Sequence, residues 1–259
     1  MIAPPRTSPV RTTVSGDSAT APIAPTWLGT VPYREAWDLQ RRLAAARAEA
    51  RIGDQLLLLE HPAVLTLGRH ADESHVRATA DELERRGIEV IRVERGGEVT
   101  YHGPGQLVAY PIIALAERRL LIRPFVRALE AAMRDTCAAL GVAADRREGH
   151  PGLWCDPDGP EPRKIGAVGI RIERGVSYHG IALNVAPDLG DFELIDACGM
   201  PGVASTSIAR ELGHDDEPPA AEGVRGGAEI FAMAFLERIG AAPMTVRETT
   251  AQTLIAEVA

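Results

Sequence analysis

The stretch RKIGAVGIRIERGVSYHGIALNVA, residues 163–186, holds two apolar and β-branched runs on either side of Gly175. This pattern predicts two long strands, 163–174 and 176–186, that pair as a hairpin. Shorter strands are expected upstream with similarly close spacing, over 55–60, 64–67, 88–94, 98–101 and 106–112. Strands that come in runs, instead of alternating regularly with helices, predict an α+β fold whose mixed β-sheet is flanked by helices.

Helices are predicted where apolar residues recur at a helical period. One begins at Tyr33 and ends near Ile52. Thr79, followed three residues later by Glu82, forms a capping box that opens a short helix ending at Gly87. Further helices are expected from Pro124 to about Leu140, over 205–212 and over 229–239.

The chain is expected to fold as one catalytic domain over 27–240. Residues 1–26 are rich in Pro, Ser, Thr and Ala without periodicity, which indicates a disordered tail. The acidic stretch GHDDEPPAAEGVRGG, 213–227, predicts a loop, and residues 241–259 form an extension whose structure the sequence leaves ambiguous.

Composition excludes several classes of protein. The 259 residues include 28 basic and 36 acidic groups, a net charge of −8, which argues against nucleic acid as the ligand. No apolar run approaches the ~20 residues of a membrane span. Three widely spaced cysteines fit a reducing cytoplasm better than a disulfide framework. No Cys-x-x-Cys pair or Cys/His cluster is present, so neither a metal nor a cofactor is expected.

One lysine, Lys164, stands among 27 arginines. Arginine can replace lysine on most surfaces, but not where an amine must lose a proton. Gly166 and Gly169 follow closely, and glycine inside a strand often marks the close approach of a ligand. Lys164 is therefore a candidate functional residue, against the alternative of a solvated lysine at a sheet edge.

The segment RGGEVTYHGPGQLVAYP, Arg95–Pro111, is dense in glycine around Thr100, Tyr101 and His102. Glycine lets backbone N–H groups approach a ligand closely, although a tight turn would need glycine too. The segment lacks the GK[ST] of a phosphate-binding loop.

Cys198 lies in a third segment, IDACGMPGVASTS, on a glycine-containing loop before the predicted helix at 205. Such a position makes a thiol accessible. Cys137 is expected in the core and Cys155 in a strand, and most such thiols are inert.

Together these segments resemble one family. RGGEVTYHGPGQLVAY, with LLLLEHPAVLTLGR, KIGAVGIRI, SYHGIALNV and ACGMPGVASTS, looks like the signature of the octanoyltransferases, the lipoyl(octanoyl) transferases of lipoate biosynthesis. The resemblance runs from about Tyr33 to Leu212. It implies the fold shared with biotin- and lipoate-protein ligases.

The resemblance also implies a site and a reaction. Cys198 would accept the acyl group and Lys164 would be its partner. The acyl pocket would be lined by Arg95, Gly96, Gly97, Glu98, Val99, Thr100, Tyr101, His102, Ala167, Val168, Gly169, Gly180, Ile181 and Ala182. The implied reaction moves an octanoyl or lipoyl group from acyl carrier protein, through a cysteine thioester, to the lysine of a lipoyl domain. The implied acceptors are the lipoyl domains of 2-oxo-acid dehydrogenase complexes and the glycine cleavage H protein.

Two other functions remain open from the sequence. One is an ATP-dependent lipoate- or biotin-protein ligase of the same fold, in which a lysine contacts an acyl-adenylate and no cysteine is required. The other is a non-catalytic module that binds an acyl chain or its carrier, with Lys164 and Cys198 incidental.

Overall fold

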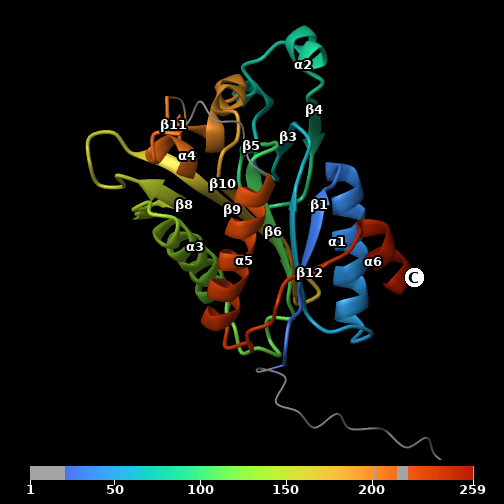
Figure 1. Cartoon of the computed structure of the whole chain (residues 1–259). Helices are drawn as coiled ribbons and strands as arrows, with labels where there is room; N and C mark the ends of the chain where they lie inside the picture. The colour runs from blue at the N-terminus through green and yellow to red at the C-terminus, as the bar shows by residue number, and fades with distance from the viewer. Residues whose placement is uncertain (1–20, 201, 215–220, 259) are drawn as a thin grey trace, which may run out of the picture.

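A mixed sheet runs through the centre of the molecule (Figure 1). The computed structural model describes residues 21–200, 202–214 and 221–258, without the side chains of residues 198, 221 and 222. Nine strands of this part form the sheet: β1 (Pro25–Thr30), β2 (Gln55–Glu60), β6 (Gln106–Ile112), β7 (Asp145–Arg147), β8 (His150–Cys155), β9 (Arg163–Glu173), β10 (Val176–Asn184), β11 (Ala204–Ser205) and β12 (Arg247–Glu248). Their order is β12-β1-β2-β6-β10-β9-β8-β7, with β11 beside β9. The pairs β12–β1, β1–β2 and β11–β9 are parallel and the others antiparallel, which makes the sheet mixed.

Helices cover both faces of this sheet (Figure 1). On one face lie α1 (Tyr33–Ala48) and α6 (Ala251–Val258), and on the other α3 (Ile122–Ala139) and α5 (Ala221–Arg238). Leu57 and Leu59 of β2 pack in the core below α1, and Leu56 and Leu58 pack in the core below α5. Because both faces are covered, the inner strands β2 and β6 are buried at nearly every position.

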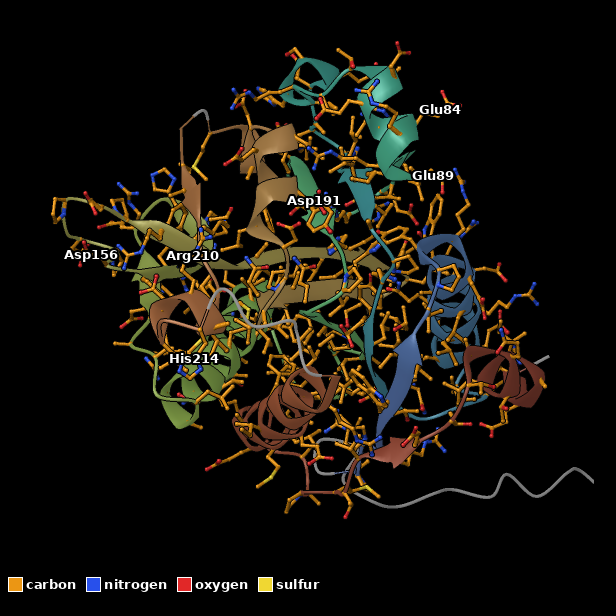
Figure 2. All side chains as sticks on the ribbon, turned by 45° about the horizontal axis from the view of Figure 1, so that its top comes forward. Glu84, Glu89, Asp156, Asp191, Arg210 and His214 are labelled. Atoms are coloured by element: carbon orange, nitrogen blue, oxygen red, sulfur yellow. The ribbon has the colours of Figure 1, made fainter. Side chains whose placement is uncertain are left out.

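A smaller sheet caps one end of the main sheet (Figure 1). Its order is β4 (Glu89–Arg92), β3 (Val64–Leu67) and β5 (Val99–His102), with α2 (Ala80–Arg86) nearby. The short helical turns η3 (Leu189–Leu194) and η4 (Ala197–Gly199) pack against it. Asp191, labelled in Figure 2, accepts hydrogen bonds from Tyr101 Oη at 2.7 Å and Arg86 Nη1 at 3.0 Å, which ties η3 to β5 and α2.

The predicted α+β fold with a flanked mixed sheet is confirmed. β2, β3 and β6 have the predicted bounds, and β9 and β10 form the predicted hairpin. Thr79 caps the predicted helix, since its Oγ1 accepts from the Glu82 backbone N–H at 3.3 Å, which is one of the two bonds of a capping box. The helix that it opens ends at Gly87, which is left-handed with φ 66°.

The loop predicted over 213–227 is wrong from Ala221 onward, because α5 begins there and not at residue 229. Residues 215–220 lie outside the described part. Val224 and Ala228 are fully buried against the core, so packing outweighs the poor helix propensity of the glycines. β1 starts at Pro25, within the predicted tail, of which residues 1–20 are not described. The ambiguous C-terminal stretch supplies β12 and α6.

None of the described helices is both long enough and apolar enough to span a membrane.

A buried ion network holds α1 to the main sheet where β2 begins and β6 ends. Asp54 Oδ1 accepts from Arg47 Nε at 2.7 Å and from the Ala114 backbone N–H at 2.9 Å. Asp54 Oδ2 accepts from Arg118 Nε. All three charged side chains are nearly inaccessible to solvent. Removing one member of such a network leaves the other charges buried and underpaired.

Asp54→Ala should therefore lower the free energy of unfolding by about 3–5 kcal/mol, the usual cost of breaking a buried ion pair. Asp38→Ala is the matched control, because the Arg42–Asp38 pair at 2.7 Å is half exposed. That change should cost no more than about 1 kcal/mol. Urea unfolding measures both, and equal costs for the two variants would contradict the assignment.

Candidate active site

One cavity of about 510 Å³ lies between the β9–β10 hairpin and the segment that leads into β5. Every predicted substrate-binding residue except Tyr101 lines this cavity. The predicted residues along its wall are Arg95, Gly96, Gly97, Glu98, Val99, Thr100, His102, Lys164, Ala167, Val168, Gly169, Gly180, Ile181 and Ala182. Three segments that are distant in sequence thus enclose one volume.

Tyr101 faces away from this cavity. It lies between Thr100 and His102 on β5, and successive side chains of a strand point to opposite faces. Its ring packs in the core of the small sheet, where its hydroxyl reaches Asp191. Tyr101 therefore supports the wall instead of lining it.

The sequence did not single out the remaining residues of the wall. These are Tyr33, Tyr110, Val126, Gly149, His150, Pro151, Ile170, His179 and Met200. Tyr110, Ile170, His179 and Met200 lie in stretches quoted above, so their segments were identified but their side chains were not. Nothing local marks Tyr33, Val126 or the turn 149–151, which only the tertiary fold brings to the cavity.

Lys164 lies at the wall with its ammonium group fixed. Its side chain is 7% exposed, Nζ donates to the Pro151 carbonyl at 2.8 Å, and Nζ sits 4.8 Å from the centre of the Trp154 ring. Gly152, with φ 109°, makes this arrangement possible. A Cβ there would lie 2.4 Å from the Gly166 carbonyl oxygen and 3.3 Å from Lys164 Nζ.

The segment around Cys198 borders Lys164. The backbone of Cys198 lies in η4, and its side chain is outside the described part. Ala197, one residue earlier, shares a small hollow with Lys164, and Met200 lines the main cavity. Ser205 of β11 pairs with Lys164 of β9. The fold thus brings segments 34 residues apart to one place.

The other two cysteines are buried, as expected. Cys137 lies in α3 and Cys155 in β8. Burial raises the pKa of both thiols to about 12, so almost none of either is thiolate near neutral pH. Neither is a plausible nucleophile.

A chain of buried hydrogen bonds joins the site's segments. His102 Nδ1 lies 2.7 Å from Gln106 Oε1, and Gln106 Nε2 donates to Asn184 Oδ1 at 2.9 Å. Asn184 Nδ2 donates to the Thr206 carbonyl at 2.9 Å, and the Thr206 backbone N–H donates to the Lys164 carbonyl at 2.9 Å. Asn184, the one asparagine of the sequence, therefore links His102 at the end of β5 to the backbone of Lys164 in β9.

Two buried histidines, His102 and His179, line the cavity, and a third, His61, packs against Tyr110 of the same wall. Burial lowers the pKa of His61 to about 4 and that of His179 to about 3. Burial lowers the pKa of His102 well below its ordinary value as well, with smaller contributions from His61 and the Arg95 guanidinium. All three rings are therefore neutral near pH 7.

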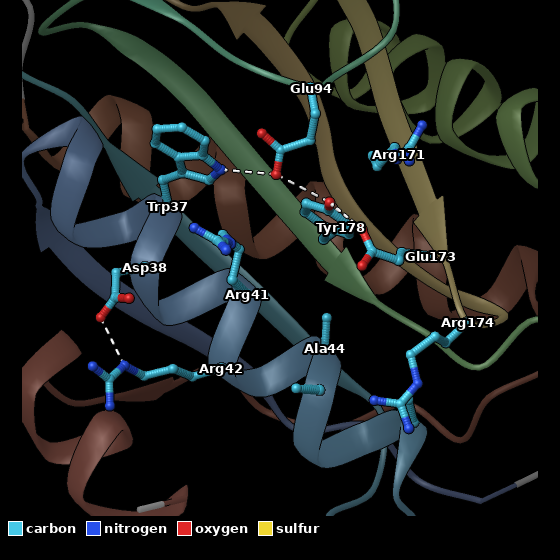
Figure 3. A pocket seen from close by; sticks show the side chains of 12 residues that line it. Trp37, Asp38, Arg41, Arg42, Ala44, Glu94, Arg171, Glu173, Arg174 and Tyr178 are labelled. Atoms are coloured by element: carbon cyan, nitrogen blue, oxygen red, sulfur yellow. Dashed lines mark hydrogen bonds and ion pairs between the residues drawn. The ribbon is translucent and has the colours of Figure 1, made fainter.

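A second cavity, of about 690 Å³, lies between α1 and the far end of the β9–β10 hairpin (Figure 3). Charged side chains line most of it, including Arg41, Arg171 and Glu173. Glu94 accepts there from Trp37 Nε1 at 3.1 Å and Tyr178 Oη at 3.0 Å. None of the predicted site residues lines this larger cavity.

The protein thus combines a mixed sheet flanked by helices with a cavity that has a buried lysine at its wall. Residues 32–222 match the family model described as "Lipoyl protein ligase A/B catalytic domain". Similar proteins include an octanoyltransferase of Chloroflexus aggregans, 47% identical over 75% of this chain and 86% of that protein. Another is an octanoyltransferase of Acidobacterium capsulatum, 49% identical over 74% of this chain and 80% of that protein. The chain belongs to the octanoyltransferase family and is an acyltransferase.

Solved structures agree on the fold. A bipartite lipoate protein ligase of Thermoplasma acidophilum aligns with a TM-score of 0.62 and 15% identity, over 92% of this chain and 91% of that one. A lipoate protein ligase of that organism with bound lipoic acid aligns at 0.59 and 18% identity, over 92% and 94%. These similarities concern the fold alone.

The buried histidines make stability depend on pH. Between pH 6.5 and about 4, histidines of the unfolded chain take up protons that His61 and His179 in the folded protein do not. The free energy of unfolding should therefore fall as the pH drops through this window, by up to about 1.4 kcal/mol per pH unit for each such histidine.

His61→Phe removes one of these histidines. It should reduce the slope of the free energy of unfolding against pH by up to about 1.4 kcal/mol per pH unit, which corresponds to one proton. His70→Gln, at an exposed position, should leave the slope unchanged. Urea unfolding between pH 7 and 5 measures both slopes. Equal slopes in His61→Phe and the wild type would show that His61 is protonated in the folded protein.

Proposed function

We propose that the protein transfers an octanoyl or lipoyl group from acyl carrier protein to the lysine of a lipoyl domain, with Cys198 as the transient acyl carrier. As a member of its family the protein acts in octanoyl transfer for lipoate biosynthesis. The observation that carries the detailed mechanism is the buried amine of Lys164 at the cavity wall, beside the segment that contains Cys198.

In the first half-reaction the Cys198 thiolate attacks the carbonyl carbon of the octanoyl thioester. The bond between that carbon and the sulfur of the carrier's pantetheine arm breaks, and the departing sulfur takes a proton. A nearby ammonium favours the thiolate form of a cysteine, and Lys164 supplies both the charge and the proton. The acyl chain lies in the cavity between the 95–102 segment and the small residues of β9 and β10, where Gly169 pairs with Gly180 and Ala167 with Ala182.

In the second half-reaction the lysine ε-amine of the lipoyl domain attacks the same carbonyl. An amide bond forms, the Cys198 sulfur leaves, and neutral Lys164 takes the proton that the attacking amine loses. Thioester-to-amide transfer is downhill, so the reaction needs no ATP.

The partners follow from this chemistry. The acceptors we propose are the lipoyl domains of 2-oxo-acid dehydrogenase complexes and the glycine cleavage H protein, in the cytoplasm. The Thermoplasma structure is described as that of a bipartite lipoate protein ligase and its E2 lipoyl domain, which supports a lipoyl domain as the acceptor.

Intact-mass measurement tests the whole scheme. Octanoyl carrier protein without ATP should give one octanoyl adduct on the protein. An adduct that forms only from free octanoate and ATP would favour a ligase, and tight carrier binding without an adduct would favour a binding module.

Cys198→Ser should abolish this adduct, because the serine hydroxyl is not ionised near neutral pH. Cys137→Ser and Cys155→Ser are the controls and should keep it, since both thiols are buried. Mass spectrometry of the peptides locates the acyl group. An adduct that persists in Cys198→Ser would overturn the assignment of the nucleophile.

Lys164→Arg should separate the two half-reactions. The guanidinium keeps a positive charge near the thiolate, but with a pKa above ~12 it cannot accept the amine's proton. Discharge of the preloaded acyl-enzyme to a lipoyl domain should then slow by ~10²–10⁴-fold, while loading slows less.

Lys164→Ala should slow both steps, because it removes the charge as well as the base. Stopped-flow or quenched measurement of each step separates these effects. Discharge of the Lys164→Arg acyl-enzyme at the wild-type rate would mean that another group is the base.

A further inference from the structure

His179 has an unusual backbone conformation. It lies inside β10, yet its φ is 55°, the left-handed region that non-glycine residues seldom occupy. Residues held in such conformations cluster at functional sites, where the surrounding structure maintains the strain.

The surroundings of His179 fix its ring. Its backbone N–H donates to Gln40 Oε1 of α1 at 2.7 Å. The ring stacks on Tyr178 at 5.1 Å between centroids and meets the Tyr110 ring edge-on at 6.3 Å. The left-handed backbone and these contacts together set the direction in which the ring points.

Neither ring nitrogen of His179 has a hydrogen-bond partner in the described protein, although the residue is only 1% exposed. Buried polar atoms are nearly always hydrogen-bonded, so two such atoms on one ring require an explanation. His61 shows the contrast, since its nitrogens lie 2.6 Å from the Val31 carbonyl oxygen and 2.7 Å from Tyr110 Oη. His179 lines the acyl cavity and His61 does not.

The position of His179 is at the far end of that cavity from Lys164. It pairs with Ile170, three residues along β9 from Ala167, which lines both this cavity and the hollow beside Ala197. Three residues of strand span about 10 Å, which an extended eight-carbon chain covers. Its neighbour Tyr178 already faces the second cavity, where its hydroxyl donates to Glu94 (Figure 3). The wall formed by Tyr178 and His179 therefore separates the two cavities.

We propose that His179 makes its end of the acyl cavity a hydrogen-bonding subsite, which accepts a medium-chain acyl group with a hydroxyl on its last carbon. This inference rests on the proposed function, because it takes the cavity to hold the acyl chain. A neutral imidazole offers one donor and one acceptor, which is what a hydroxyl needs. A longer saturated chain would instead bury a methyl group against both nitrogens.

Two probes of nearly equal shape test the subsite. Nonanoic acid and 8-hydroxyoctanoic acid differ only in a terminal methyl or hydroxyl group. Calorimetry of the free acids should show that the wild type binds the hydroxy acid more tightly. His179→Phe should lower the ratio of the two affinities about tenfold, the loss expected for one hydrogen bond. The corresponding acyl carrier protein conjugates should show the same change in loading rate.

Three controls isolate the effect. His61→Phe makes the same ring replacement outside the cavity and should leave the ratio unchanged. His179→Asn keeps hydrogen-bonding atoms and tolerates the left-handed backbone, so it should give an intermediate ratio and stands in if His179→Phe fails to fold. A butyryl donor is too short to reach His179, so its loading rate in each variant is the reference against which the loading of the two longer donors is expressed.

An affinity ratio that stays unchanged in both His179 variants would overturn the subsite. A wild type that binds both acids but never forms an acyl-enzyme would instead count against the proposed function alone. The two failures are therefore distinguishable.

Discussion

The hydrogen bond between Gln106 and Asn184 is the contact on which the geometry of the site depends. It joins β6 to β10, and through its neighbours it connects His102 on one side to the backbone of Lys164 on the other. All five residues of this chain of hydrogen bonds are buried, so a change in any one of them leaves a buried polar group without a partner. The small sheet, the central hairpin and the segment after Cys198 are thereby held in one relative position.

The cavity is produced by missing side chains. A Cβ at Gly169 would lie 3.0 Å from the Gly96 carbonyl oxygen, a tight contact, so glycine favours the close approach of β9 to the 95–102 segment. Across the hairpin Gly169 faces Gly180 and Ala167 faces Ala182, which leaves a narrow space between large neighbours. The spacing between these backbones therefore sets the width of the cavity. Burial keeps His61, His102 and His179 neutral.

The sequence could predict the strands whose signal is local, and the site segments whose composition is unusual. β2, β3 and β6 were predicted residue by residue because turn residues bound their apolar runs. Lys164 could be predicted because it is the one lysine of the sequence, in which the other 27 basic residues are arginines. Tyr33 and His150 carried no such mark, since they reach the cavity only through the packing of α1 and β8. The early start of α5 depends in the same way on burial of Val224.

Segments from opposite ends of the sequence pair at one edge of the main sheet. β12 pairs with β1, Thr26 with Arg247 and Trp27 with Glu248, while α6 packs beside α1. During synthesis β1 leaves the ribosome long before its outer neighbour exists, so one edge of the sheet stays unpaired until residue 248 has emerged. An open strand edge is a template for association with other chains. The outer edge of β1 is therefore open to association with other chains until Arg247 and Glu248 have been synthesised.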